Sequence, residues 1–155
     1  MRIYLVQHGE AKSEQEDPRR TLTDNGIREV QKVADFLRPL TVEVDTVWHS
    51  GKSRAQQTAE LLATTLGAQA RVVAREGLGP KDSVAPMKEA LEHAGGNVMI
   101  VGHLPFLGKL VALLVTSHEE IEIVEFQYGS VVSLERGIDG SWKVRWMITP
   151  GLLQR

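Results

Sequence analysis

Short apolar runs alternate with amphipathic stretches along the first 115 residues of the chain. The apolar runs are too short to be buried helices, and each is followed by polar residues or glycine. Runs of this kind are typical of buried strands. The pattern therefore predicts strands at 3–6, 44–48, 71–74 and 98–101.

The stretches between these runs carry apolar residues at helical spacing. Thr23 is suited to cap a helix that ends before Pro39, because its hydroxyl can accept a backbone N–H of the first turn. Further helices are predicted over 54–66, 84–94 and 105–115. The apolar face of the first helix consists of Ile27, Val30, Val33, Ala34 and Leu37.

Alternation of strands and helices predicts the α/β class, with a mostly parallel sheet between helices. The pattern changes from Ile121 onward, where apolar and polar residues alternate between turn residues such as Gly129 and Gly137. That part predicts two or three antiparallel strands at one edge of the sheet. No repeat, linker or low-complexity tract interrupts the sequence, so residues 1–155 are interpreted as one domain.

The composition excludes several classes of function. A net charge of -2 leaves no basic stripe for nucleic acid. The absence of cysteine excludes disulfides, thiolate nucleophiles and iron–sulfur clusters. No apolar stretch approaches the roughly 20 residues of a membrane span, and the first residues lack the pattern of a signal peptide. We therefore expect a cytoplasmic protein with no nucleic-acid or membrane partner.

Three histidines, His8, His49 and His103, stand at the ends of predicted strands. Ligands of open α/β sheets bind beyond the carboxyl ends of the strands, so these imidazoles are expected at one edge. A single histidine there is usually a surface residue or a hydrogen-bonded core residue. However, Gly9 and Gly102 adjoin two of them, and glycine allows close ligand approach that a Cβ would block. His49 has no such neighbour, and its ordinary interpretation stands.

Arg54 is predicted to lie in the first turn of the helix after the second strand. Backbone N–H groups and the helix dipole favour an anion there, and a guanidinium can bind a phosphate through two hydrogen bonds. Most helical arginines are solvated surface charges, but the position beyond a strand end favours an anion site. Lys52 in the same turn adds a second cation.

The order of these motifs resembles that of the histidine phosphatase superfamily. The pieces are a strand ending in His8-Gly9, a Ser-x-x-x-Arg-x-x-Gln-Thr motif at 50–58, and Gly102-His103 after a later strand. The short length, the Arg-Thr-Leu-Thr segment at 20–23 and the His-Leu-Pro sequence at 103–105 are similar to SixA-type phosphohistidine phosphatases. The resemblance covers nearly the whole chain.

The resemblance implies a three-layer α/β/α sandwich and a phosphatase that needs no metal or cofactor. It implies that His8 attacks phosphorus and carries the phosphoryl group transiently, while the carbonyl of Gly9 holds the other ring nitrogen. Arg54, His103 and Arg20 are then the donors that stabilise the transferring group. The implied substrate is a phosphohistidine-bearing protein such as a phosphotransfer domain. The oligomeric state is left open, a monomer included.

The residue before the expected nucleophile departs from the superfamily pattern. Its first motif normally reads Arg-His-Gly, and this chain reads Gln7-His8-Gly9. A neutral donor is worth about half as much as a charge-assisted one. Gln7 is therefore a substrate-binding candidate that supplies no charge, which Lys52 or Arg19 would have to provide instead.

The proton donor to the leaving group is the other open point. The superfamily usually employs an acidic residue, and Glu76, beyond the third strand, is the first candidate, with Asp82 as the second. A phosphoramidate substrate needs such an acid less than an alcohol ester does.

Three other interpretations follow from the same residues. A binding module that holds phosphohistidine or a phosphopeptide with weak turnover is suggested by Gln7. A phosphoglycerate-mutase-like transferase or broad-specificity phosphomonoesterase is disfavoured, because the segment between Leu66 and Val98 is short for an inserted helical lid. A metal site made of the three strand-end histidines is disfavoured, because no carboxylate accompanies them at familiar spacing.

Overall fold

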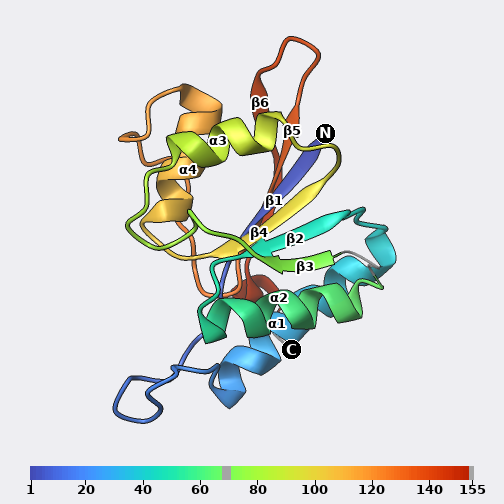
Figure 1. Ribbon diagram of the computed structural model, residues 1–155. Helices are drawn as coiled ribbons and strands as arrows, with labels where there is room; N and C mark the ends of the chain where they lie inside the picture. Colours follow the sequence, from blue (N-terminus) through green and yellow to red (C-terminus); the bar gives the residue numbers. More distant parts are fainter. Residues whose placement is uncertain (68–70, 154–155) are drawn as a thin grey trace.

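The computed structural model describes residues 1–67 and 71–153, and a six-stranded sheet forms its centre (Figure 1). The strands are β1 (Arg2–Gln7), β2 (Thr46–His49), β3 (Arg71–Ala74), β4 (Val98–Gly102), β5 (Val131–Arg136) and β6 (Trp142–Ile148). Their order across the sheet is β3-β2-β4-β1-β5-β6. The first four are parallel, whereas β5 runs antiparallel to β1 and β6 antiparallel to β5.

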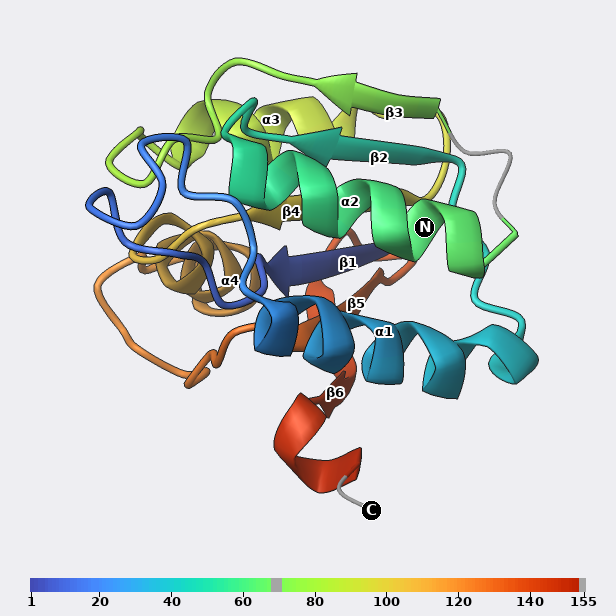
Figure 2. The ribbon, with the colours of Figure 1, turned by 90° about the horizontal axis from the view of Figure 1, so that it is seen from below.

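Helices cover both faces of this sheet. They are α1 (Asp24–Leu37), α2 (Ser53–Thr65), α3 (Ala85–Glu92) and α4 (Phe106–Thr116), with short 3-10 helices η1 (Arg38–Leu40) and η2 (Pro150–Leu153). α1 and α2 lie on one face, and α3 and α4 on the other (Figures 1 and 2). The expected α/β/α sandwich is confirmed. No helix within residues 1–67 and 71–153 is long and apolar enough to cross a membrane.

The central strand β1 contributes to both cores. Successive side chains of a strand point to opposite faces. Ile3 and Leu5 accordingly belong to the core under α3 and α4, and Tyr4 and Val6 to the core under α1 and α2. All four are at most 2% exposed, and burial of such a side chain contributes about 1.5–3 kcal/mol. An uninterrupted apolar run is what a strand covered on both faces requires.

Helix α1 begins as the sequence predicts. The hydroxyl of Thr23 accepts the backbone N–H of Gly26 at 2.9 Å, which caps the first turn. The buried face differs at one position, because Ile27 is 38% exposed and Gly26 is buried in its place. A Cβ on Gly26 would collide with the backbone carbonyl of Glu10, so only glycine allows this segment to pack on the helix.

One strand prediction needs correction, and another is confirmed. β2 begins at Thr46 rather than at 44, because Asp45 is bonded outside the ladder: its carboxylate accepts the N–H of Asn97 at 2.7 Å. The two or three antiparallel strands expected after residue 121 are two in the described part of the chain, β5 and β6. Residues 121–130 form neither strand nor helix, and Phe126 packs into the core that α4 covers.

The topology brings the ends of three parallel strands together. Gln7 on β1 pairs with Gly102 on β4, and His49 on β2 pairs with Val101. β5 runs the other way, with Val131 opposite Val6, so residues 128–130 enter the sheet at this same edge. This is the edge at which open α/β sheets bind ligands.

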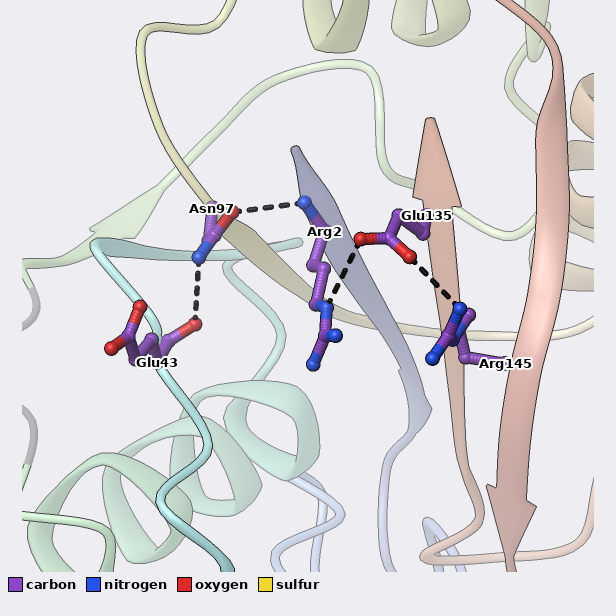
Figure 3. A network of polar contacts seen from close by, with 5 residues as sticks. All are labelled: Arg2, Glu43, Asn97, Glu135 and Arg145. Atoms are coloured by element: carbon purple, nitrogen blue, oxygen red, sulfur yellow. Dashed lines mark hydrogen bonds and ion pairs between the residues drawn. The ribbon is translucent and has the colours of Figure 1, made fainter. Parts of the chain in front are cut away.

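A polar network fastens the opposite edge (Figure 3). The side chain of Asn97 accepts the backbone N–H of Arg2 at 2.9 Å and donates to the carbonyl of Glu43 at 3.2 Å. Glu135 pairs with Arg2 at 3.5 Å and with Arg145 at 3.2 Å. Exposed ion pairs contribute about 0–1 kcal/mol each, so the network aligns the strands more than it stabilises them.

Candidate active site

His8 and His103 lie side by side at the carboxyl edge of the sheet. Their ring centroids are 4.9 Å apart, and the side chains are 7% and 2% exposed. The sheet itself sets this distance, because β1 and β4 are neighbours and the N–H of His8 donates to the carbonyl of Gly102 at 3.1 Å. The sequence prediction that strand ends bring these two residues together is confirmed.

The ring of His8 is held in one tautomer. Its Nδ1 lies 2.7 Å from the carbonyl oxygen of Gly9. A carbonyl only accepts hydrogen bonds, so Nδ1 carries the proton and Nε2 keeps its lone pair. The imidazole is thus oriented as a nucleophile by its own backbone.

Burial lowers the pKa of His8 from 6.5 to about 4, and the positive charges of Arg54 and Arg20 act in the same direction. The hydrogen bond to Gly9 opposes this shift without cancelling it. His8 is therefore neutral at physiological pH, which is the state in which Nε2 can attack an electrophile.

His103 is neutral for similar reasons. Burial lowers its pKa to about 3, and His8, Arg54, Lys52 and Arg20 add to the effect. Its Nε2 lies 2.6 Å from the hydroxyl of Ser50, while its buried Nδ1 has no hydrogen-bond partner within the described residues.

Arg54 supplies a cation at the start of α2. It is the second residue of that helix, as predicted, where backbone N–H groups already favour an anion. Its buried Nε has no hydrogen-bond partner in the described part of the chain, and burial together with Arg20 lowers the pKa of its guanidinium. A partly buried guanidinium with a free donor beside two neutral imidazoles is suited to bind an oxyanion.

Two residues of the motif at 50–58 join the nucleophile loop to α2. The hydroxyl of Thr58 accepts the N–H of Gly9 at 3.0 Å and donates to the carbonyl of Arg54 at 2.8 Å. The amide oxygen of Gln57 accepts the N–H of Leu22 at 2.8 Å. The spacing of the motif thus lets Gln57 and Thr58 bond the loop that follows β1, while Arg54 stays in the first turn of α2.

Arg20 reaches the site from the loop between β1 and α1. It has a left-handed backbone with φ of 49°, and its Nε donates to the carbonyl of Lys12 at 3.0 Å. Asp17 shapes this loop by accepting the N–H groups of Arg19 and Thr21. Figure 2 shows the loop, in blue, on the side where β1, β2 and β3 end.

Tyr128 is a residue of the site that the sequence analysis missed. Its ring lies 5.6 Å from the ring of His8, and it is 49% exposed. The N–H of the following Gly129 donates to the carbonyl of Gln7 at 3.0 Å, which holds the turn against the end of β1. An aromatic residue before a glycine and an apolar strand was the available signal.

Within the described residues, no hydrogen bond joins the other residues singled out from the sequence to the histidine pair. His49 is buried, and its Nδ1 accepts the N–H of Gly51 at 3.1 Å, the structural role expected of it. Glu76 is exposed in the turn after β3, the edge strand. The carboxylate of Asp82 accepts the N–H of Gly79 at 2.7 Å and closes a loop.

Gly9 and Gln7 differ in detail from the expectation. A Cβ on Gly9 would lie 2.8 Å from Val30 of α1, so close packing on a helix, rather than ligand approach, requires this glycine. Gln7 is 7% exposed, and its amide oxygen has no hydrogen-bond partner among the residues described. Lys52 precedes α2 and lowers the pKa of His103, whereas Arg19 is exposed.

The site does not resemble a metal centre. Within residues 1–67 and 71–153, no three His, Asp or Glu side chains gather in a way that could hold a metal ion. No carboxylate is among the charged groups that shift the pKa of His8 or His103. Two neutral imidazoles beside arginines are suited to hold an oxyanion such as a phosphoryl group.

Comparisons with known proteins identify the family to which the chain belongs. Residues 3–79 match the model of the histidine phosphatase superfamily (branch 1). The chain is 28% identical over 155 residues to phosphohistidine phosphatase SixA of Escherichia coli, covering 97% of this chain and 94% of that protein. An uncharacterized protein of Picosynechococcus is 33% identical over 117 residues, 70% of either chain. The chain belongs to the histidine phosphatase superfamily.

Solved structures give the same result. A structure of the protein histidine phosphatase SixA with tungstate superposes with a TM-score of 0.88 at 26% identity, covering 99% of this chain and 100% of that one. A putative α-ribazole-5'-P phosphatase of Escherichia coli superposes with a TM-score of 0.80 at 19% identity and shares the fold. Membership of the superfamily supports phosphatase activity for this chain.

Proposed function

We propose that this chain hydrolyses phosphohistidine on a protein, by way of a phosphohistidine formed transiently on His8. The observation that carries the proposal is the state of His8: Nδ1 is held 2.7 Å from a carbonyl, burial lowers the pKa to about 4, and the charges of Arg54 and Arg20 act on the ring. A neutral imidazole with one nitrogen held leaves the other free to attack.

The first step exchanges one P–N bond for another. Nε2 of His8 attacks phosphorus, the new P–N bond forms, and the bond to the imidazole of the substrate breaks. The phosphorylated ring of His8 then carries a positive charge, and its Nδ1–H still donates to Gly9. Arg54 and Arg20 offset the charge of the equatorial oxygens, and His103 adds a neutral donor. Attack by water releases phosphate and restores His8.

The chemistry of the leaving group favours a phosphohistidine substrate. When the second nitrogen of the substrate ring is protonated, cleavage of the P–N bond releases a neutral imidazole, and no enzyme acid is required. An alcohol ester would release an alkoxide and would need a proton donor. Because no carboxylate is among the charges that act on the histidine pair, the site is better suited to a phosphoramidate. Glu76 remains our candidate donor for any ester substrate.

The relatives support the same substrate class. SixA of Escherichia coli is named a phosphohistidine phosphatase, and the SixA structure was obtained with tungstate, an oxyanion similar in charge to phosphate. We propose on these grounds that the chain acts as one domain on a phosphohistidine-bearing protein, without a metal or cofactor.

Trapping the intermediate tests the proposal. Wild-type protein mixed with phosphoramidate labelled with ³²P and quenched in alkali should carry label that is stable to base and lost in acid. His8→Ala should carry none and should release no phosphate. His49→Ala is the matched control, because His49 is a buried strand-end histidine outside the pair. Label that persists in His8→Ala would refute the assignment.

The second candidate function is a phosphohistidine-binding module, and Gln7 is the residue that favours it. Its neutral, buried amide replaces a guanidinium, which favours a module that binds phosphohistidine with little turnover. The same experiment separates the two: a binding module would show saturable affinity for a stable phosphohistidine analogue but neither label on His8 nor phosphate release.

A further inference from the structure

A groove lies against α4 and begins at the turn that follows His103. One of its walls is the β4–α4 turn with Leu104 and Pro105, and the other is the segment that returns after α4, with Val124 and Phe126. Its volume is about 460 Å³. In Figure 2 that segment, in orange, leaves the end of α4 and comes back to β5. We call this feature the α4 groove.

Each wall of the α4 groove lies within two residues, along the chain, of His103 or Tyr128. Leu104 follows His103 in the chain and is 39% exposed. Phe126 stands two residues before Tyr128, whose ring contacts that of His8. Two residues of chain span at most about 7 Å. A macromolecule whose phosphohistidine reaches His8 would therefore rest on this groove.

The rim of the α4 groove is acidic. Glu119, Glu120, Glu122 and Glu125 line it, against a single cation, Lys109. Within the described residues, none of these four glutamates takes part in an ion pair or a side-chain hydrogen bond. Their charge is therefore available to a partner rather than offset by the fold.

The charge around the histidine pair is positive, opposite to that of the rim. Arg54, Arg20 and Lys52 are the charged side chains that act on the histidine pair. A partner that fits both features carries its phosphoryl group among basic and apolar residues. A small phosphorylated metabolite could use only the pocket, and an acidic protein surface would be repelled by the rim.

We propose that the α4 groove is the docking surface for the substrate protein, and that it selects a partner whose phosphohistidine is flanked by lysine or arginine and by apolar side chains. The proposal rests on the proposed function. The occupant is a basic phosphoprotein rather than a second copy of this chain, because the chain has a net charge of -2 and would bring like charges together.

The test compares two synthetic peptides of equal length that carry one phosphohistidine, flanked in one by Lys and Leu and in the other by Glu and Leu. Wild-type protein should hydrolyse the basic peptide with a kcat/KM about tenfold higher, mostly through KM, and salt should reduce the difference. Glu122→Lys combined with Glu125→Lys should abolish the preference and leave hydrolysis of phosphoramidate unchanged. Glu43→Lys combined with Glu89→Lys changes the same charge on exposed residues elsewhere and should keep the preference.

Several outcomes would overturn the docking proposal while leaving the enzyme intact. These are equal hydrolysis of the two peptides by the wild type, and a preference that the groove variant retains. A dimer detected by sedimentation that only the groove variant abolishes would assign the surface to a second copy instead. If phosphoramidate is not hydrolysed, the proposed function fails separately. Affinities for the same peptides with a stable phosphohistidine analogue then decide the role of the groove.

Discussion

The hydroxyl of Ser50 lies 2.6 Å from Nε2 of His103. The same oxygen accepts the N–H of Lys52 at 3.4 Å. A hydroxyl can either donate to Nε2 or accept from it, so the bond to Ser50 ties the tautomer of His103 to the orientation of this hydroxyl. We infer that Ser50 is a positioning residue, because its bond holds one tautomer of His103.

Replacing Ser50 should therefore alter His103 more than the fold. We expect Ser50→Ala to lower kcat on phosphoramidate by about tenfold, the loss of one orienting hydrogen bond in the site. ¹⁵N NMR of the imidazoles should show a single tautomer of His103 in the wild type and a tautomer mixture in the variant. Ser53→Ala, three residues further on, is the control. An unchanged tautomer in Ser50→Ala would contradict the role.

Thr58 joins the backbone of Gly9, next to His8, to helix α2, which carries Arg54. Thr58→Val keeps the shape of the side chain but leaves the N–H of Gly9 without its acceptor in a buried position. We expect a loss of about 1–3 kcal/mol in the free energy of unfolding, measured by urea denaturation, together with a lower kcat. Thr64→Val, on the exposed side of α2, should change neither. Equal effects of Thr58→Val and Thr64→Val on stability and kcat would show that the hydrogen bond between Gly9 and Thr58 has no special role.

The pKa of His8 predicts how the site responds to pH. Burial and arginines lower that pKa to about 4, and a histidine is neutral above its pKa. His8 should therefore stay neutral down to about pH 5, whereas an ordinary histidine becomes protonated near 6.5. NMR titration of the His8 ring checks the value. Arg54→Met removes a positive charge and should raise the pKa. A wild-type pKa near 6.5 would show that the ring is not desolvated.

We expect Arg54 to support phosphate release through the positive charge and the paired N–H donors of its guanidinium. We expect Arg54→Ala to lower phosphate release by about two to three orders of magnitude, and Arg54→Lys to recover only part of this, because lysine is a point charge. Steady-state kinetics with phosphoramidate measures both. Arg28→Ala, on the exposed side of α1, is the control. Turnover within about twofold of the wild type in Arg54→Ala would make Arg54 a structural residue.

Gln7→Arg tests whether the chain lacks a phosphate-binding charge. We expect vanadate or phosphate to bind more tightly by about 1–2 kcal/mol, an effect that salt should weaken. Gln7→Met removes the amide without adding charge and should not produce the gain. Calorimetric titration of these variants and of Lys52→Ala measures it. Flat affinity in Gln7→Arg with a loss of affinity in Lys52→Ala would mean that Lys52 already supplies this charge. No change in any variant would mean that Gln7 does not adjoin the phosphate.

Most of the fold could be predicted from the sequence because its signals are local. The cap at Thr23 and the apolar runs of β1 and β4 each record burial or hydrogen bonding within a few residues. The number of strands after Ile121 is left open by the sequence, as two or three. Two form, and residues 121–130 pair with no strand within the described part of the chain, although apolar and polar residues alternate there. Phe126 packs on a helix instead.

The candidate site shows the same division. His8, His103 and Arg54 stand at the ends or starts of regular elements, so the topology places them without further information. Ser50 follows β2 and begins the motif at 50–58, but its bond to His103 could not be predicted, because it joins residues 50 and 103. The approach of Tyr128 to His8 likewise joins residues far apart in the chain, and a local pattern does not specify such contacts.

The order of strands in the sheet also bears on how the protein is made. β1, which carries the expected nucleophile, comes first in the chain, yet its two neighbours are β4 and β5, which begin at Val98 and Val131. During translation β1 leaves the ribosome with both edges unpaired and stays so until those later strands emerge. Unpaired apolar strands are prone to aggregation. Catalytic competence would be among the last properties the nascent chain acquires, and β1 is the segment most in need of chaperone protection until then.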